Sequence, residues 1–143
     1  MRDRVGFTLL ELIMVVVIIG ILASIAGPMY FKTVERARIA EARRMLGMIR
    51  MAQMRYYAEH GQFTSNMNEL DIDIVDGKYF NIVRTVSTAS GTTPNSTNKA
   101  IGEVKRKDFQ DTYGTYTLKI LPNGKVCGES GLPADLKKFI PTC

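Results

Sequence analysis

The chain has 143 residues, which leaves room for one modest domain and an accessory segment but not for several large domains. Its single histidine and two cysteines exclude a zinc site built from those residue types, and no metal or other cofactor is predicted. The formal net charge of +5 is a mild basic bias that normally lies on solvated surface, so nucleic acid is compatible with it but not a predicted partner. No nucleophile motif or phosphate-binding loop is visible, so the chain is not predicted to be an enzyme.

The N-terminus combines a short basic segment with a long apolar run. Arg2 and Arg4 precede an apolar stretch that extends from Phe7 to about Ala26. A bilayer core of about 30 Å needs about 20 apolar residues in helical form, so this stretch is long enough to cross a membrane. The basic residues are expected to stay cytoplasmic, which places the C-terminal domain outside. The alternatives are a plain membrane anchor and a conventional signal peptide, for which the run is long and lacks a clear cleavage site.

Glu11 is an acidic residue near the start of this apolar run. A charged carboxylate deep in a membrane is disfavoured by about 2–3 kcal/mol, so a plain anchor has no use for it. Cleavage between Gly6 and Phe7 would expose a new α-amine one helical turn before Glu11. Opposite charges about 4 Å apart attract by about 4 kcal/mol before desolvation at an effective dielectric constant near 20. The acid therefore predicts pairing with such an amine, of the same or of a neighbouring subunit.

The sequence from Gly6 to Glu11, GFTLLE, resembles the processing motif of type IV prepilins and type II secretion pseudopilins. The resemblance implies that a prepilin peptidase cuts between Gly6 and Phe7 and methylates the exposed amine of Phe7. It also implies that Glu11 docks an incoming subunit against the amine of its neighbour in a filament.

The same resemblance implies three parts of the chain. Residues 1–6 are a cleaved leader peptide, and residues 7–31 form a helix that first spans the membrane and later builds the filament core. Residues 32–143 form the globular pilin head, which includes an amphipathic half of the helix to about residue 60. The fold class expected is α+β, with a long, partly transmembrane N-terminal helix packed on a small antiparallel sheet and a disulfide-closed C-terminal region.

Gly20 and Pro28 interrupt the apolar run with residues that weaken a helix. Proline lacks the backbone N–H and clashes with the preceding turn, and Gly20 and Gly27 have low helix propensity. By the resemblance, Gly20 and Pro28 match the glycine and proline that border a locally unwound stretch of helix in filaments of the family. The alternative is a simple kink at Pro28 in an intact helix.

After Pro28 the sequence becomes polar and strongly helix-forming. Apolar residues recur at three- and four-residue steps and predict one buried stripe: Ile39, Ala42, Leu46, Ile49, Ala52 and Tyr56. Gly61 predicts the end of this helix. One helix is expected from Phe7 to about His60, about 80 Å long at about 1.5 Å per residue. Four methionines on it are interpreted as packing residues: Met45, Met48, Met51 and Met54.

The remainder of the chain predicts a small antiparallel sheet. Residues 66–70 suggest a helical turn, and residues 79–86 and 113–121 predict strands because apolar and polar side chains alternate in them. Residues 85–98 are rich in serine, threonine, asparagine and glycine, which predicts an exposed loop. Pro122, Asn123 and Gly124 predict a hairpin with a type I′ turn, followed by a return strand.

Cys127 and Cys143 lie near the C-terminus. Because the N-terminal segment predicts export to an oxidising compartment, they are predicted to form a disulfide, the alternative being two unrelated reduced thiols. A closed loop of about 15 residues would stabilise the fold by about 3 kcal/mol. The tail bounded by these cysteines also resembles the disulfide-closed C-terminal region of pilins.

The resemblance implies a structural subunit of a type IV pilus, which assembles with copies of itself into a helical filament used for adhesion, twitching motility or DNA uptake. Its other partners would be the prepilin peptidase and the pilus or secretion assembly machinery in the inner membrane. The subunit would be stored there as a single-pass protein with a periplasmic C-terminal domain before joining an extracellular pilus. The alternatives are a type II secretion pseudopilin and a membrane-tethered binding domain that never polymerises.

Overall fold

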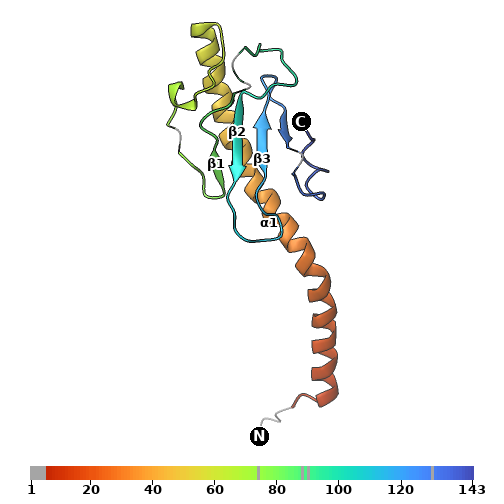
Figure 1. The fold of residues 1–143 in the computed structure, drawn as a ribbon. Coiled ribbons are helices and arrows are strands. Elements are labelled where there is room, and N and C mark those ends of the chain that lie inside the picture. Colours follow the sequence, from red (N-terminus) through yellow and green to blue (C-terminus); the bar gives the residue numbers. More distant parts are fainter. Residues whose placement is uncertain (1–5, 74, 88, 90, 130) are drawn as a thin grey trace. The chain divides into compact units, whose positions relative to one another are not determined.

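The computed structural model describes residues 6–73, 75–87, 89, 91–129 and 131–143. The chain divides into two compact units, an N-terminal unit (Met1–Ala37) and a C-terminal unit (Arg38–Cys143). The elements in chain order are α1 (Leu9–His60), the 3₁₀ helix η1 (Met67–Glu69), β1 (Phe80–Ile82), β2 (Gly102–Arg106), β3 (Thr117–Ile120) and β4 (Val126–Gly128) (Figure 1). Helix α1 contributes residues to both units, while the other elements belong to the C-terminal unit.

Helix α1 ends where the sequence predicts. Gly61 has a φ of +71°, and its N–H donates a hydrogen bond of 2.8 Å to the carbonyl of Tyr57. A positive φ at this position is typical of a helix C-cap and is low in cost only for glycine. The helix begins at Leu9, two residues after the predicted start at Phe7.

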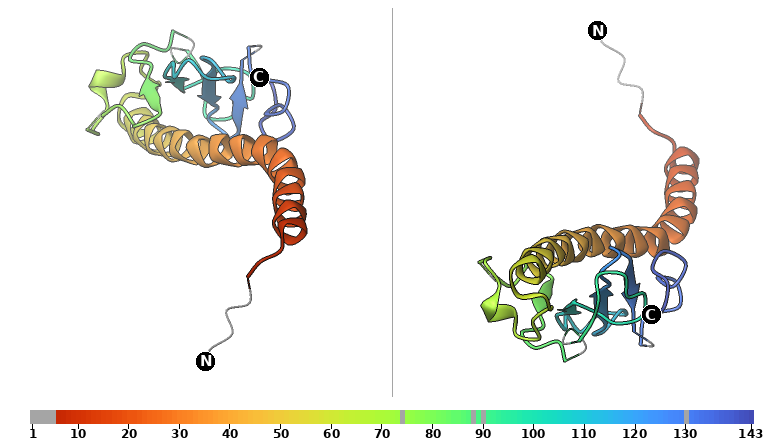
Figure 2. Two further views of the ribbon diagram at one scale, coloured as in Figure 1. Left: turned by 90° about the horizontal axis from the view of Figure 1, so that it is seen from below. Right: turned by 90° about the horizontal axis from the view of Figure 1, so that it is seen from above.

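The four strands form one antiparallel sheet in the order β1-β2-β3-β4. In the C-terminal unit, α1 lies along one face of this sheet (Figure 2). Five of the six residues of the predicted helix stripe are buried, and Tyr56 is partly buried against the same core. The opposing strand residues are also buried: Phe80, Ile82, Val104, Leu118 and Ile120. The predicted α+β fold of a long helix on a small antiparallel sheet is confirmed.

Strand β2 was not predicted, and its first residue allows the helix and sheet to pack closely. A Cβ atom placed on Gly102 would lie 2.6 Å from Cγ2 of Ile49 in α1 and 3.1 Å from Cγ2 of Ile120 in β3. Real Cβ atoms do not approach other carbons to 2.6 Å. Glycine at this position is therefore required by the packing of α1 against the centre of the sheet.

A buried amide joins α1 to two segments of the C-terminal unit. Gln53 is fully buried, and its Nε2 donates hydrogen bonds to the carbonyls of Thr64 at 2.8 Å and Ile101 at 3.1 Å. Its Oε1 accepts a hydrogen bond from the N–H of Thr64 at 3.1 Å. A buried amide is tolerated only when its donors and acceptor are satisfied, so these contacts fix where the chain after α1 and the chain before β2 meet the helix.

A buried arginine organises the connection between β2 and β3. The side chain of Arg106 has no exposed surface, and its Nη2 lies 2.7 Å from Oδ2 of Asp111. Its Nη1 donates a hydrogen bond of 2.6 Å to the carbonyl of Gly114. Arg38 of α1 binds the same Asp111 oxygen at 3.0 Å and lies over the ring of Phe109. One carboxylate therefore neutralises a buried cation and also binds the β2–β3 connection to α1.

The segment 85–98 is not simply the exposed loop that the sequence predicts. Among its described residues, Val86, Ala89 and Thr92 are buried, and Val86 and Ala89 belong to the hydrophobic core. The N–H of Val86 donates a hydrogen bond of 2.8 Å to the carbonyl of Ser65. The small apolar residues scattered among its polar ones thus cover one side of the core.

The hairpin between β3 and β4 forms at the predicted place, but its turn is not type I′. A type I′ turn with Asn123 and Gly124 at its centre needs positive φ at both residues. Asn123 does not have one, because Gln110 is the one non-glycine residue with positive φ in the described part of the chain. Gly124 has a φ of +86°, and its N–H donates to the carbonyl of Leu121 at 2.9 Å. Pro122 fixes a negative φ at the first central position, so the residues fit a type I turn followed by glycine.

Candidate functional site

The predicted cleavage site lies immediately before α1. Gly6 and Phe7 are exposed and precede the first helical residue, whereas residues 1–5 of the predicted leader lie outside the described residues. Thr8 caps the helix, because its Oγ1 accepts a hydrogen bond of 3.3 Å from the N–H of Glu11. Its carbonyl accepts a hydrogen bond of 3.2 Å from the N–H of Leu12. The Gly6–Phe7 peptide bond thus lies before the helix, between two exposed residues.

Glu11 lies in the first turn of α1 and is exposed. It occupies the third helical position after the Thr8 cap, where an acidic residue interacts favourably with the helix N-terminus by about 0.3–1 kcal/mol. The capping role of Thr8 was not predicted from the sequence, although a threonine followed three residues later by a glutamate is a known signal for the start of a helix. The contribution of the helix N-terminus is small beside the attraction of about 4 kcal/mol, before desolvation, that is expected between Glu11 and an amine about 4 Å away.

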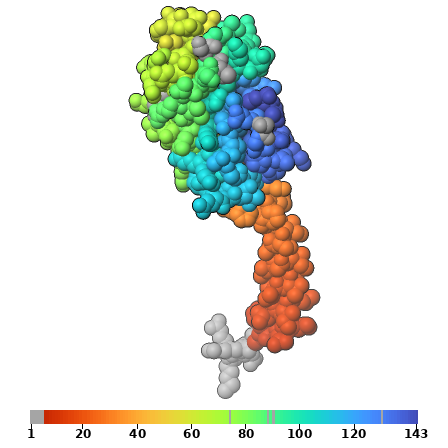
Figure 3. All heavy atoms as spheres, in the orientation of Figure 1, coloured from red at the N-terminus to blue at the C-terminus, as the bar shows by residue number. Residues whose placement is uncertain are grey.

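The N-terminal part of α1 presents an apolar surface on all sides. Between residues 7 and 31 the large apolar side chains are exposed by 47% at Val15 to 82% at Phe7 (Figure 3, red and orange). In the described part of the chain, α1 is the one helix long and apolar enough to cross a membrane. Exposure of so large an apolar surface to water is unfavourable. This segment therefore requires lipid or other apolar helices around it.

Gly20 and Pro28 both lie inside α1, and the helix continues through them. Pro28 has no N–H to donate to the carbonyl of Ser24, one turn earlier. The hydroxyl of Ser24 donates a hydrogen bond of 2.7 Å to the carbonyl of Ile21. A Cβ atom at Gly20 or Gly27 would meet nothing within 4 Å. Packing within the chain therefore does not explain why these two positions carry glycine.

The predicted disulfide is present between Cys127 of β4 and Cys143, whose Cα atoms are 5.0 Å apart. The tail also forms backbone hydrogen bonds beside it: the N–H of Gly128 donates to Pro141 at 2.9 Å, and the N–H of Cys143 donates to Gly128 at 3.0 Å. Three apolar residues of the closed loop are buried in the core: Leu132, Leu136 and Ile140. The loop is thus part of the folded C-terminal unit.

The sequence-predicted residues fall into two groups. Gly6, Phe7 and Glu11 lie together at the start of α1, with Gly20 and Pro28 farther along the same helix. The two cysteines lie in the C-terminal unit and have no part in the N-terminal site.

Replacing both cysteines by alanine is expected to lower the free energy of unfolding by about 3 kcal/mol, because a closed loop of about 15 residues restricts the unfolded chain. Chemical denaturation of the full-length chain in detergent would measure the change. Reduction of the wild-type protein should cause a loss of similar size, whereas an unchanged denaturation midpoint after reduction would contradict the stabilising role.

Comparison with known proteins gives matches over both parts of the chain. Residues 40–125 match the protein family described as type IV pilin-like G and H, and residues 1–27 match the prokaryotic N-terminal methylation motif. The chain is 37% identical to the fimbrial protein EcpC of Eikenella corrodens over 96% of this chain and 89% of that protein. It is 34% identical to a fimbrial protein of Neisseria meningitidis serogroup A over 90% of this chain and 91% of that protein.

A further match covers less of each chain. The type IV major pilin protein PilE1 of Neisseria gonorrhoeae is 34% identical over 67% of this chain and 57% of that protein. The two family matches together cover the exposed apolar part of α1 and the strands β1, β2 and β3, so the similarity is not confined to the N-terminal motif. The chain belongs to the type IV pilin family.

Proposed function

We propose that this chain is the repeating structural subunit of a type IV pilus, with no enzymatic activity of its own. Residues 1–6 are the leader, residues 7–31 hold the subunit in the inner membrane and then form the filament core, and residues 32–143 are the head. A prepilin peptidase cuts between Gly6 and Phe7 and methylates the new amine. Assembly then moves the subunit from the membrane into an extracellular filament.

The observation that carries this proposal is the exposed apolar surface of α1 directly behind a methylation motif in a type IV pilin. A membrane and a bundle of identical helices are both apolar environments, so the same surface can be transferred from one to the other at little cost. The C-terminal unit (Arg38–Cys143), which makes up most of the proposed head, has its own buried core. It can remain folded while the environment of the apolar helix changes.

Glu11 is proposed to receive the amine of Phe7 from a neighbouring subunit. Both groups lie near the start of α1, so an acid and an amine from adjacent copies can pair inside an apolar bundle, where their attraction is less screened than in water. An incoming subunit that lacks this pair would leave a charged amine without a partner in an apolar environment, which is costly.

Gly20 and Pro28 are proposed to border a stretch of α1 that unwinds in the filament. The absence of any atom within 4 Å of a Cβ at Gly20 supports this proposal, since a helix-weakening glycine has no packing role there in the single chain. The missing donor at Pro28 lowers the cost of unwinding the turn that precedes it.

The relatives that cover nearly the whole chain are named as fimbrial proteins, and this favours a pilus over a type II secretion pseudopilus. Electron microscopy of material sheared from intact cells distinguishes a pilin from a membrane-tethered receptor. A pilin gives long filaments in the supernatant, whereas a tethered receptor stays with the membrane fraction.

Mass spectrometry of the sheared filaments is expected to find a mature chain that begins at Phe7 and carries one methyl group on its α-amine. Replacing Gly6 with valine should block cleavage, because the branched side chain adds bulk at the scissile bond, and should leave the precursor in the inner membrane. Replacement of exposed Lys99, far along the chain, with alanine is the control and should leave cleavage normal. Filaments built from chains that still begin with Met1 would contradict the proposal.

A further inference from the structure

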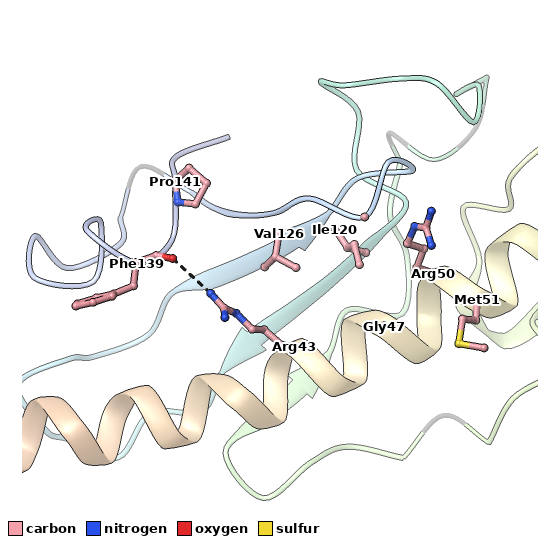
Figure 4. A pocket seen from close by; sticks show the side chains of 9 residues that line it. Arg43, Gly47, Arg50, Met51, Ile120, Val126, Phe139 and Pro141 are labelled. Atoms are coloured by element: carbon pink, nitrogen blue, oxygen red, sulfur yellow. Dashed lines mark hydrogen bonds between the residues drawn. The ribbon is translucent and has the colours of Figure 1, made fainter.

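A groove of about 530 Å³ lies in the C-terminal unit between α1 and the part of the sheet that ends in the C-terminal tail (Figure 4). We use the term basic groove for five of its lining residues: Arg43, Gly47, Arg50, Met51 and Phe139. The first four come from α1, and Phe139 comes from the disulfide-closed loop.

The basic groove combines positive charge with apolar walls. Arg43 is exposed, and its Nη2 donates a long hydrogen bond of 3.4 Å to the carbonyl of Phe139. Arg50 donates from Nε to the carbonyl of Pro122 at 2.8 Å. Among the described residues neither guanidinium has an acidic partner, and Met51 and Phe139 are 62% and 44% exposed. A surface of this kind suits a partner that has both carboxylates and an apolar side chain.

Met48 and Met51 differ from the expectation that the helix methionines serve packing. Met45 is buried, but Met48 is 56% exposed, and Met51 lies on the groove. Exposed methionine side chains are flexible and polarisable and therefore adapt well to a partner surface.

Gly47 lines the groove and leaves open space where a side chain would begin. A glycine inside a helix costs about 1 kcal/mol relative to alanine. A Cβ atom at Gly47 would meet nothing within 4 Å, so no contact within the chain requires glycine at this position. Close approach of another surface to the helix backbone at Gly47 would explain why glycine is present despite its cost to helix stability.

The opposite edge of the sheet has the complementary surface, which we call the acidic edge: Asp71, Asp73 and Val75. All three residues are exposed, Val75 by 73%. Within the described part of the chain, the two carboxylates have no salt-bridge or side-chain hydrogen-bond partner. The acidic edge immediately precedes β1 in the chain, and the basic groove is lined by Ile120 of β3 and Val126 of β4, so the two surfaces are associated with opposite ends of the strand order.

We infer that the basic groove binds the acidic edge of a second copy of this chain. Carboxylates of Asp71 and Asp73 would approach Arg43 and Arg50, while Val75 contacts the apolar wall. Two different surfaces at opposite edges make a heterologous contact, which repeats from copy to copy instead of closing a dimer and builds an open filament when the rotation between copies does not close a ring. This inference rests on the proposed function, because it adds a contact between the globular heads to a filament that is also held by the apolar helices.

Charge reversal tests this contact in the full-length chain. Arg43→Glu and Asp73→Lys should each lower the yield of sheared filaments about tenfold, because each places like charges together at every repeat. The double variant Arg43→Glu/Asp73→Lys restores opposite charges and should recover most of the yield. Lys99→Glu, an exposed reversal outside both surfaces, is the matched control and should assemble normally.

Two further readouts separate assembly from folding. Each variant should accumulate in the membrane in processed form with the Cys127–Cys143 disulfide intact, which shows that the head has folded. Gly47→Met fills the groove without a change of charge; it should raise the denaturation midpoint of the subunit and still lower filament yield.

The outcomes are distinct. If the wild-type chain forms no filaments, the proposed function and this inference both fail. If the wild type assembles and Arg43→Glu, Asp73→Lys and Gly47→Met all assemble equally well, only the inference fails. If Arg43→Glu filaments form normally but lose binding to a polyanion such as heparin, the groove takes an external polyanion and the second-copy contact is overturned.

Discussion

Replacing Glu11 with glutamine is expected to lower the yield of sheared filaments about a hundredfold while cleavage after Gly6 and methylation of Phe7 continue. The side chain keeps its size but loses the charge that pairs with the neighbouring amine. The attraction of about 4 kcal/mol before desolvation corresponds to a factor of more than a hundred in an equilibrium constant. Electron microscopy and immunoblotting of sheared and membrane fractions measure the two effects separately.

The choice of glutamine also distinguishes docking from helix capping. Glutamine serves as well as glutamate at the third helical position after a threonine cap, so the local contact of Thr8 with the N–H of Glu11 is retained. Glu11→Asp keeps the charge on a shorter side chain and should assemble better than Glu11→Gln. Filaments of normal abundance from Glu11→Gln would show that the acid does not dock subunits.

Replacing Asp111 with alanine is expected to destabilise the head by about 3 kcal/mol. The change removes the carboxylate 2.7 Å from the fully buried Arg106 and thereby the charge–charge attraction that this pair provides. Loss of one member of a buried pair typically costs about 3–5 kcal/mol, and the partial exposure of Asp111 places it at the lower end. Urea denaturation of the purified subunit would measure the loss.

The contribution of Asp111 should also depend on pH. Burial raises the pKa of its carboxyl, but hydrogen bonds from Arg106 and from a backbone N–H outweigh this effect and hold the pKa below its ordinary value. A lowered pKa stabilises the fold fully at pH values above the unfolded pKa of about 4, and this stabilisation is lost as pH falls through the folded pKa. Asp111→Asn should therefore lose less stability on acidification than the wild type. Equal losses would exclude the pair as a source of acid sensitivity.

Local sequence signals were sufficient to predict the N-terminal motif of the family and the buried face of the helix. The order of basic leader, GFTLLE and apolar run lies within 26 residues, so it can be recognised without knowledge of the fold. The spacing of Ile39, Leu46 and Ile49 reflects the helical repeat directly, and these residues are buried. The cysteine pair followed from the prediction of export.

Strand β2 could not be recognised because its sequence, GEVKR, has one large apolar residue. Its glycine is required by contact with Ile49, and its buried arginine depends on a carboxylate in the following connection. Both facts arise from tertiary packing, which can override strand propensity. The basic groove was missed for a related reason: Arg43 and Phe139 are far apart in the sequence, and the fold brings them together.

The closure of the C-terminal tail over β4 has a consequence for crowded subunits. A strand at the margin of a sheet has free peptide groups that can recruit a strand from another molecule and lead to aggregation. Here Pro141 and Cys143 occupy the N–H and carbonyl of Gly128, and the disulfide keeps the tail in place. Under the proposed function, neighbouring heads are thereby protected from β-pairing at this margin.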